Sequence, residues 1–286
     1  MSGDDRPDDA GDAVARSLDA IADQLDATLG LAVLDQPDGV HAHRKAVRRL
    51  RSTLAAYRPF FDADTVRRLH RTYRDWGREL GEARDLEVRI AVAERFLDDD
   101  DDDAAAGARM LDELRTAYRD AHRAVARRGV SVDARDRRAD LAAFLDAPPR
   151  TAKASRRTKR GVRRRIVKEG DRVLRRAAAA TSGPGDDVAL HELRKAARRL
   201  RYAVESVTRP PVGLFGAKAD ALAVSAEQIH DLLGDVRDLL AFARAYEAAG
   251  GVSDGPAARA KVEAAEKLDE LPAAVDDLRG ALAQFR

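Results

Sequence analysis

Cysteine is absent from the 286-residue sequence, and aromatic residues make up only 5% of it. The first absence excludes disulfides, thiolate nucleophiles and zinc sites built on cysteine. No apolar run approaches the roughly 20 residues that a transmembrane helix needs, so we expect no membrane partner. The N-terminus, MSGDDRPDDAGD, is acidic and polar, unlike a secretory signal, and we expect a cytoplasmic protein.

Charged residues, by contrast, make up 36% of the chain, and a net charge of only +2 conceals their separation. Residues 1–38 are acidic and residues 98–103 form an unbroken aspartate run, whereas residues 150–176 carry many cations against only Glu169 and Asp171. Such segregation favours a local anion site over a generally cationic surface. Arginine far outnumbers lysine, and its planar guanidinium pairs bidentately with phosphate or carboxylate.

Apolar residues recur three or four positions apart and no segment alternates as a strand would, which predicts an all-α fold. We expect a disordered acidic N-terminus over residues 1–11, then two halves, residues 12–147 and 148–286, divided near Pro148 and Pro149. The aspartate run and residues 181–185 are predicted to be a loop and a turn. The predicted helices cover residues 12–34, 39–58, 63–96, 105–128, 135–146, 150–179, 186–207, 215–248 and 256–283.

An eleven-residue motif occurs twice in the chain. Residues 41–51 (HAHRKAVRRLR, the first motif) and residues 191–201 (HELRKAARRLR, the second motif) are identical at eight of eleven positions, at an offset of 150 residues. Downstream, residues 80–86 (LGEARDL) match residues 233–239 (LGDVRDL) in the same order and at nearly the same offset. Two matched blocks in register predict an internal duplication into two homologous four-helix bundles.

Each motif places a basic face on its predicted helix, because positions i, i+3, i+4 and i+7 share one side. Like charges at this spacing repel by a few tenths of a kcal/mol per pair, so we expect an anionic ligand or acidic partners to compensate them. The predicted basic faces consist of His41, Arg44, Lys45, Arg48 and Arg51, and of His191, Arg194, Lys195, Arg198 and Arg201. The sides opposite carry Val40, Val47, Leu50 and Leu54, and Leu193, Ala197, Leu200 and Val204.

Residues 150–179 form a third basic element with a thin apolar stripe. Cations recur there at helical spacing, and we expect Arg157, Arg160 and Arg164, with Lys153 and Lys168, to form a third wall of the same anion site. A basic linker or a nucleic-acid-binding arm is the alternative for this segment.

Motifs for catalysis and metal binding are missing. The sequence contains no Walker loop, nucleophile elbow or His-x-x-x-His pair, so we expect a protein without catalytic activity, bound metal or cofactor. A metal site assembled in three dimensions by His41 and His191 stays an alternative. Asp85 and Asp238, each preceded by arginine, are interpreted as partners that orient basic side chains of a neighbouring helix, with acid–base catalysis as the alternative.

Nucleic acid is an alternative ligand that the aromatic residues disfavour. Single-strand binding uses aromatic rings between the cations, on which bases stack. The candidates Tyr57, Tyr73, Trp76 and Tyr202 lie instead at positions predicted to be in the core or at its rim. A ligand dense in phosphates and without bases fits these residues better.

The paired motifs resemble the CHAD domain, the conserved histidine alpha-helical domain. The family pattern is a His-x-x-Arg helix start, then Arg-Arg-Leu-Arg and a Leu-Gly-x-x-Arg-Asp block, repeated in the second half, and the resemblance covers about residues 12–285. It implies two four-helix bundles around a basic cavity or channel. It also implies that the two basic faces bind inorganic polyphosphate, with other polyanions as further partners, and some members localise to polyphosphate granules.

Two positions depart from the family pattern. His43 stands on the core side, where an apolar residue is usual, and Lys45 replaces a residue that is often aliphatic. Either residue changes the packing of the first half or adds to its charge. The Glu-x-Glu-x-Lys motif of the CYTH triphosphatase domain, to which some members are fused, is absent, so we expect a stand-alone domain that does not hydrolyse triphosphate.

Overall fold

The computed structural model describes residues 7–97, 104–181, 187–251 and 255–286. These residues form an all-α fold, as predicted, and within them the only β-type pairing is an isolated bridge between Phe61 and Arg150. No described helix combines the length and apolar character that a membrane crossing requires. The helices are α1 (Ala10–Val33), α2 (Gly39–Tyr57), the 3-10 helix η1 (Arg58–Phe60), α3 (Ala63–Phe96), α4 (Ala104–Gly129), α5 (Val132–Asp146), α6 (Thr158–Thr181), α7 (Asp187–Thr208), α8 (Ala217–Ala248), α9 (Pro256–Asp269) and α10 (Leu271–Phe285).

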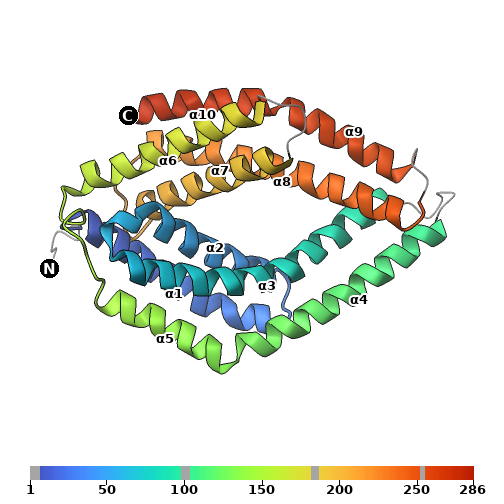
Figure 1. Cartoon of the computed structure of the whole chain (residues 1–286), viewed down its shortest axis with the longest axis horizontal. Coiled ribbons are helices and arrows are strands. Elements are labelled where there is room, and N and C mark those ends of the chain that lie inside the picture. The colour runs from blue at the N-terminus through green and yellow to red at the C-terminus, as the bar shows by residue number, and fades with distance from the viewer. Residues whose placement is uncertain (1–6, 98–103, 182–186, 252–254) are drawn as a thin grey trace.

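The helices form two groups that meet at the centre of the molecule. Figure 1 shows α1–α5 in one group and α6–α10 in the other, so the predicted division near residue 148 falls between α5 and α6. Helices α2 and α7 pack against each other where the groups meet. The groups meet again at the far end, where α3 contacts α8 and α9, and α4 contacts α8.

A common hydrophobic core joins the two groups. Buried side chains of α1, α2, α6, α7, α8 and α10 form one continuous cluster, in which Leu50 and Leu200 are fully buried. Across the α2–α7 contact, the Tyr57 hydroxyl donates a hydrogen bond to the Ala203 carbonyl (2.7 Å). A second cluster, around the stacked rings of Phe96 and Phe242, packs the far end. The predicted halves therefore share their core, and their origin by duplication stays a prediction.

The segment before α6 is not helical, although the sequence predicts a helix from residue 150. Its backbone forms hydrogen bonds with other elements. The Ala10 amide donates to the Arg156 carbonyl (3.1 Å), and the Thr151 amide donates to the Phe60 carbonyl (2.9 Å). These tertiary hydrogen bonds outweigh local helix propensity, which is a weak preference. These hydrogen bonds consequently hold the start of α1 against the residues directly before α6.

Helix α1 begins at Ala10, inside the stretch 1–11 that the sequence predicts to be disordered. The Asp9 carboxylate accepts a hydrogen bond from the Asp12 amide (2.8 Å) and caps the helix. Residues 1–6, the aspartate run at 98–103 and most of the turn predicted at 181–185 lie outside the described residues.

The final predicted helix, residues 256–283, is two helices in the structure. Pro272 lies in the first turn of α10, directly after α9 ends at Asp269. Proline lacks an amide hydrogen and clashes with the preceding turn, so it is tolerated at a helix start and not in the interior. Pro272 is therefore the residue that separates the two helices.

Candidate anion-binding site

The first motif lies on α2 and the second on α7, the two helices that pack together at the centre. The apolar residues opposite both basic faces are buried, as predicted: Val40, Val47, Leu50, Leu54, Leu193, Ala197, Leu200 and Val204. Their burial fixes the rotation of each helix, because turning it would expose these side chains to water. The cations of both motifs are thereby held beside the α2–α7 contact.

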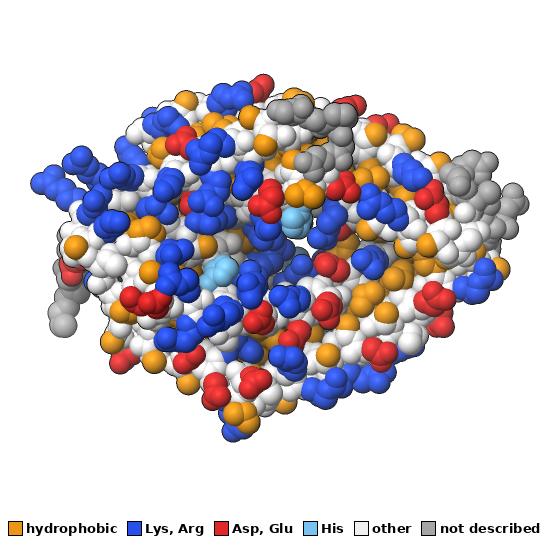
Figure 2. Space-filling view, in the orientation of Figure 1, with side chains coloured by type: hydrophobic (Ala, Val, Ile, Leu, Met, Phe, Trp, Pro, Cys, Tyr) orange, Lys and Arg blue, Asp and Glu red, His pale blue; other side chains and the backbone are white. Residues whose placement is uncertain are grey.

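Two basic cavities adjoin this contact. The first, here the Arg51 cavity, has a volume of about 230 Å³, and its described lining holds seven basic side chains against one acidic. The second, the Arg44 cavity, has a volume of about 310 Å³, with seven basic side chains against four acidic. Arg48 lines both, so the cavities adjoin. Figure 2 shows Lys and Arg side chains gathered around a hollow in the middle of this face.

The structure distributes most of the predicted site residues over these cavities. The Arg51 cavity contains Arg48, Arg51, Lys195 and Arg198. The Arg44 cavity contains His41, Arg44, Lys45, Arg48, Arg194 and Arg201. Lining residues that the sequence reasoning did not assign are His70, Arg172, Arg176 and Arg199 in the former, and Arg84, Tyr202, His230 and Arg237 in the latter. Of these, Arg84 and Arg237 belong to the Leu-Gly-x-x-Arg-Asp blocks.

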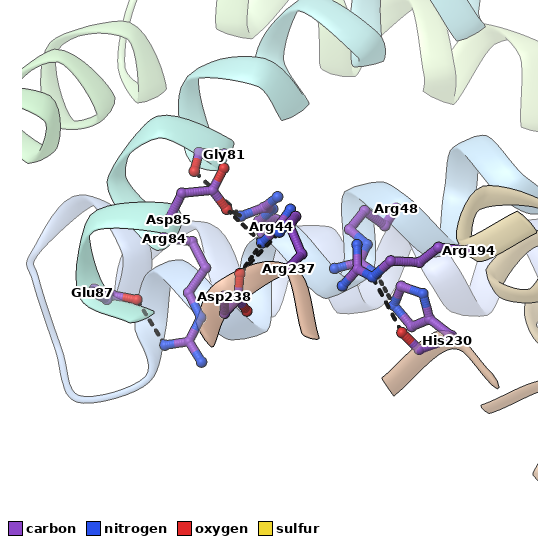
Figure 3. Close-up of polar contacts among 10 residues, drawn as sticks. All are labelled: Arg44, Arg48, Gly81, Arg84, Asp85, Glu87, Arg194, His230, Arg237 and Asp238. Carbon is purple, nitrogen blue, oxygen red and sulfur yellow. Dashed lines mark hydrogen bonds and ion pairs between the residues drawn. The ribbon is translucent and has the colours of Figure 1, made fainter. Parts of the chain in front are cut away.

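Arg44 of the first motif is fixed by α3. Its Nη1 donates to Asp85 Oδ1 (3.0 Å) and to the Gly81 carbonyl (3.3 Å), as Figure 3 shows. The ion pair confirms that Asp85 orients a basic side chain of a neighbouring helix. A β-carbon at Gly81 would lie 3.7 Å from the guanidinium, an ordinary van der Waals contact, so this position has room for alanine. Asp85, which also lies 3.6 Å from Arg237, thus compensates part of the charge that Arg44 would offer a ligand.

Arg194, the corresponding residue of the second motif, has a different environment. Its Nε donates to the His230 backbone carbonyl (3.2 Å), and no carboxylate among the described residues pairs with it. Asp238, which corresponds to Asp85, accepts a 2.6 Å hydrogen bond from its own neighbour Arg237. The prediction that Asp238 pairs with another helix in the same way is therefore wrong. Arg194 keeps its charge.

Gly234 makes room for Arg194. A β-carbon there would come within 2.9 Å of the guanidinium, so any larger residue would displace it. Burial, followed by repulsion from Arg237 and Arg48, lowers the pKa of Arg194 to about 10. The lowered pKa reflects loss of water around Arg194 and repulsion from its neighbours, which Asp238 only partly offsets.

Arg48 is held by a neutral partner. Its Nη2 lies 2.6 Å from His230 Nε2, and because arginine only donates, the histidine nitrogen accepts and the ring proton lies on Nδ1. Burial and the neighbouring Arg194 and Arg48 charges lower the pKa of His230 far below its usual value. His230 is therefore uncharged, and it positions Arg48 without cancelling its charge.

Arg51 and Arg198 have no ion pair and no hydrogen-bonded side chain among the described residues. Burial, then repulsion from Arg48 and Arg194, lowers the pKa of Arg198 to about 9. Burial and Arg74 lower that of Arg51. Within the described part of the chain, four site arginines consequently lack a carboxylate partner, and we call them the unpaired arginines: Arg48, Arg51, Arg194 and Arg198.

The CHAD domain family model matches residues 13–247. This chain belongs to the CHAD domain family. Two solved structures share its fold. PptA from Streptomyces chartreusis has a TM-score of 0.68 and 23% identity, covering 96% of this chain and 99% of that one. The CHAD domain from the plant Ricinus communis has a TM-score of 0.70 and 21% identity, covering 98% of this chain and 94% of that one. No curated protein matches the chain.

Arg201 of this CHAD domain is neutralised, unlike Arg51, its counterpart in the first motif. Its guanidinium lies 3.0 Å from the Glu205 carboxylate and 2.6 Å from that of Glu227. Burial opposes the charge of Arg201, but the two glutamates outweigh it and raise the pKa. Arg201 therefore forms part of the wall of the Arg44 cavity and offers little charge to a ligand.

A fully buried carboxylate, Glu169 of α6, supports the wall of the Arg51 cavity. Arg199 donates to Glu169 (2.9 Å) and to the Ala55 carbonyl (2.6 Å), and Arg172 lies 3.2 Å from the same carboxylate. Arg165 contacts it at 3.7 Å. Since Ala55 lies in the last turn of α2, where carbonyls lack helix partners, the cluster ties α2, α6 and α7 together.

The two motif histidines of the CHAD domain are not brought together. His41 lines the Arg44 cavity, whereas His191 lies in a mainly apolar pocket of about 250 Å³ formed by α7, α8 and α9, which shares Arg194 and Arg237 with the Arg44 cavity. Burial and Arg84 lower the pKa of His41, and burial and Lys195 lower that of His191. Across the described ranges, no group of three or more His, Asp or Glu side chains is placed to hold a metal ion.

The two departures from the CHAD pattern have separate consequences. His43 is buried, with its Nε2 accepting from the Trp76 indole (2.9 Å) and its Nδ1 2.9 Å from the Thr28 hydroxyl. Burial and Arg137 lower its pKa to about 4, so it is a neutral core residue with both nitrogens satisfied. Lys45 is exposed at the edge of the Arg44 cavity and adds to its charge.

The predicted stripe on α6 does not form the third wall. Arg157, Arg160 and Arg164 are exposed and line neither cavity, whereas Arg172 and Arg176 of the same helix line the Arg51 cavity. The reason is geometric. A helix turns about 100° per residue, so each i+4 step moves a side chain about 40° around the axis. Over three such steps Arg172 is turned about 120° away from Arg160.

Proposed function

We propose that this chain binds inorganic polyphosphate, without hydrolysing it, in the two adjoining cavities beside the α2–α7 contact. The observation that carries the proposal is the set of unpaired arginines. Their pKa values are lowered because burial removes water and nearby arginines repel them. A bound polyanion would supply the missing negative charge, and charge-assisted hydrogen bonds from arginine to phosphate are among the strongest in proteins.

The arrangement favours a ligand with successive phosphates. Unpaired arginines line both cavities, Arg51 and Arg198 in one, Arg194 in the other, and Arg48 in both. A single phosphate would contact only part of this set, whereas a linear chain of phosphates can contact each arginine in turn. Polyphosphate carries such charges without other chemical groups that the cavities would have to accommodate.

Nucleic acid is the second candidate, and the positions of the aromatic rings speak against it. Tyr57, Tyr73, Trp76 and Tyr202 are all at most 3% exposed, in agreement with their predicted place in the core or at its rim. Tyr202 lines the Arg44 cavity, but its ring is 3% exposed and faces the Arg201 guanidinium at 5.5 Å, whereas sequence-tolerant single-strand binding relies on open ring faces for stacking. The phosphates of a nucleic acid would still be attracted, and competition must therefore be measured.

The proposal of binding without turnover is supported by two of the four carboxylates that line the Arg44 cavity. Asp85 and Asp238 are engaged by Arg44 and Arg237, respectively. These two carboxylates are thus occupied by arginine side chains rather than placed to activate a water molecule. The absence of hydrolysis is tested by incubating the protein with polyphosphate and measuring released phosphate.

The proposal extends to localisation, since a polyphosphate-binding domain would gather at polyphosphate granules. A fluorescent fusion should colocalise with granules in cells that contain polyphosphate and become diffuse in cells that lack it. The same fusion carrying R48Q and R198Q should stay diffuse in both. Granule association of that variant would contradict the assignment of the site.

The decisive experiment is isothermal titration with long-chain polyphosphate over a series of salt concentrations. Engagement of the four unpaired arginines predicts that the logarithm of the association constant falls with the logarithm of salt concentration with a slope of about −3 or steeper. Single-stranded RNA of equal phosphate content should compete weakly. No binding at low salt, or RNA binding equal to that of polyphosphate, would refute the proposal.

A further inference from the structure

A row of cations lies on the outward face of α6 and on Arg157, the residue directly before this helix. None of these cations lines either cavity. We call Arg157, Arg160, Arg164 and Lys168 the cation ladder: all four are exposed, and none has an ion pair with a carboxylate in the described residues. Figure 2 shows Lys and Arg side chains gathered in the region of α6.

The acidic residues of this region cannot neutralise the ladder. Among residues 150–176, the only acids are Glu169 and Asp171. Glu169 is 0% exposed and held by arginines, and Asp171 contacts Arg286. Neither acid of this stretch is therefore paired with the ladder, although Arg150 and Arg176 at its two ends contact acids of α7 or of the start of α1.

The ladder leads to the Arg51 cavity. From Arg160 onward the cations follow each other at i+4, through Lys168 to Arg172 and Arg176, which line that cavity. Each step advances about 6 Å along the axis and about 40° around it. Successive cations are thus neighbours on the helix surface, and together they form a continuous track from the cavity to the start of α6.

The ladder contributes nothing favourable to the fold. Cations in the first turn of a helix oppose its dipole, and like charges at i+4 repel each other. Helix α6 is held instead by its buried side, where Val162, Ile166 and Val173 are 0% exposed. Replacing the ladder cations should therefore leave the fold intact, which makes their role open to a direct test.

The chemistry of this surface specifies its partner. No exposed large hydrophobic residue lies in the described part of residues 150–181, so nothing there would insert into a membrane or stack on a base. A surface of cations alone suits a linear polyanion. We propose that the cation ladder binds the part of a polyphosphate chain that protrudes from the Arg51 cavity, so that affinity increases with chain length; this inference rests on the proposed function.

The test compares two variants against short and long ligands. The ladder variant is R157Q/R160Q/R164Q/K168Q. The matched control, R109Q/R127Q/R135Q/K218Q, removes three exposed arginines and one exposed lysine that line neither cavity. Titrations use tripolyphosphate and chains of hundreds of phosphates, and thermal unfolding monitors the fold of both variants.

For long chains, the ladder variant should bind roughly tenfold to a hundredfold more weakly, as expected for four exposed ion pairs. Its salt slope should become shallower by up to about 3, since each lost contact contributes about 0.7. Tripolyphosphate affinity should stay unchanged in that variant, and the control variant should match the unmodified protein with both ligands.

Three results would overturn the inference. Unchanged long-chain affinity of the ladder variant would show that α6 does not bind, while the proposed function stands. An equal loss for tripolyphosphate would place the ladder within the short-ligand site. If the unmodified protein bound neither ligand, the proposed function itself would fail, and the inference with it.

Discussion

The first and second motifs are nearly identical in sequence, yet their arginines are neutralised at different positions. In the first motif Arg44 is paired with an aspartate and Arg51 is unpaired. In the second motif the pattern is reversed, since Arg194 is unpaired and Arg201 is paired with two glutamates. Equivalent arginines in matching motifs thus offer very different charge to a ligand.

Residues outside the motifs cause this difference. At the motif offset of 150, Glu205 corresponds to Ala55; at the offset that relates Leu80 to Leu233, Glu227 corresponds to Arg74. The first half therefore has a neutral residue and a cation where the second half has two carboxylates. Each motif therefore supplies the cations, whereas residues outside the motif determine which cations remain without a carboxylate partner and can contact a ligand.

The strongest test of this comparison removes two unpaired arginines, in the variant R48Q/R198Q. Buried charge contacts of this kind are worth about 2–5 kcal/mol each, so polyphosphate affinity should fall by about a thousandfold or more, measured by titration. Thermal stability should stay equal or rise, because uncompensated buried charge is removed.

The paired counterpart provides the control. R44Q should weaken binding less and lower thermal stability more, because it removes the shorter of the two ion pairs of Asp85 and leaves only the one with Arg237 (3.6 Å). If R44Q proved more harmful to binding than R48Q/R198Q, the distinction between paired and unpaired arginines would be wrong.

The next test concerns a carboxylate that supports the paired cations. E169Q should lower the free energy of unfolding by about 3 kcal/mol, because it leaves the half-buried arginines around the fully buried Glu169 without compensation. Denaturant titration of the unfolding transition measures this change. E192Q, at an exposed pair with Lys195, should cost under about 1 kcal/mol. Equal effects of the two substitutions would contradict the structural role of Glu169.

A smaller effect is expected from making the first motif resemble the second. A55E places a carboxylate at the position that corresponds to Glu205, within one turn of Arg51. Neutralising that arginine should weaken polyphosphate binding about tenfold, the equivalent of about 1.4 kcal/mol. A55Q has nearly the same shape without the charge and should bind normally. Equal losses for A55E and A55Q would assign the effect to volume.

The smallest predicted effect is a dependence on pH. Burial, with repulsion from Arg51 and Arg199, lowers the pKa of His70 in the Arg51 cavity to about 4. A bound polyanion would raise this pKa, so between pH 6.5 and 4 the complex holds more protons than the free protein and affinity rises as pH falls. The gain should be about threefold and should disappear in H70Q, by titration at matched ionic strength. An unchanged pH profile in H70Q would exclude His70.

Much of the fold and part of the site could be predicted from the sequence. Apolar spacing located most helices, because one side of each must be buried, and the motifs placed Arg48 and Arg198 correctly beside the cavities. The non-helical segment before α6 could not be predicted, because its conformation depends on hydrogen bonds to α1 and η1. His230 was missed for a similar reason, since it lies outside both motifs and only the packing of α8 brings it to Arg48.

The i+4 track on α6 has a mechanical consequence. From Arg160 to Arg176 it winds around the helix in a right-handed sense with a pitch of about 54 Å, as i+4 geometry dictates. Duplex DNA is stiff over about 150 base pairs and would lie tangent to such a track, meeting few of its cations. A flexible polyphosphate chain can bend around the helix and contact each of these cations. The winding of α6 would thus discriminate between polyanions by their flexibility, independently of any chemical group they carry.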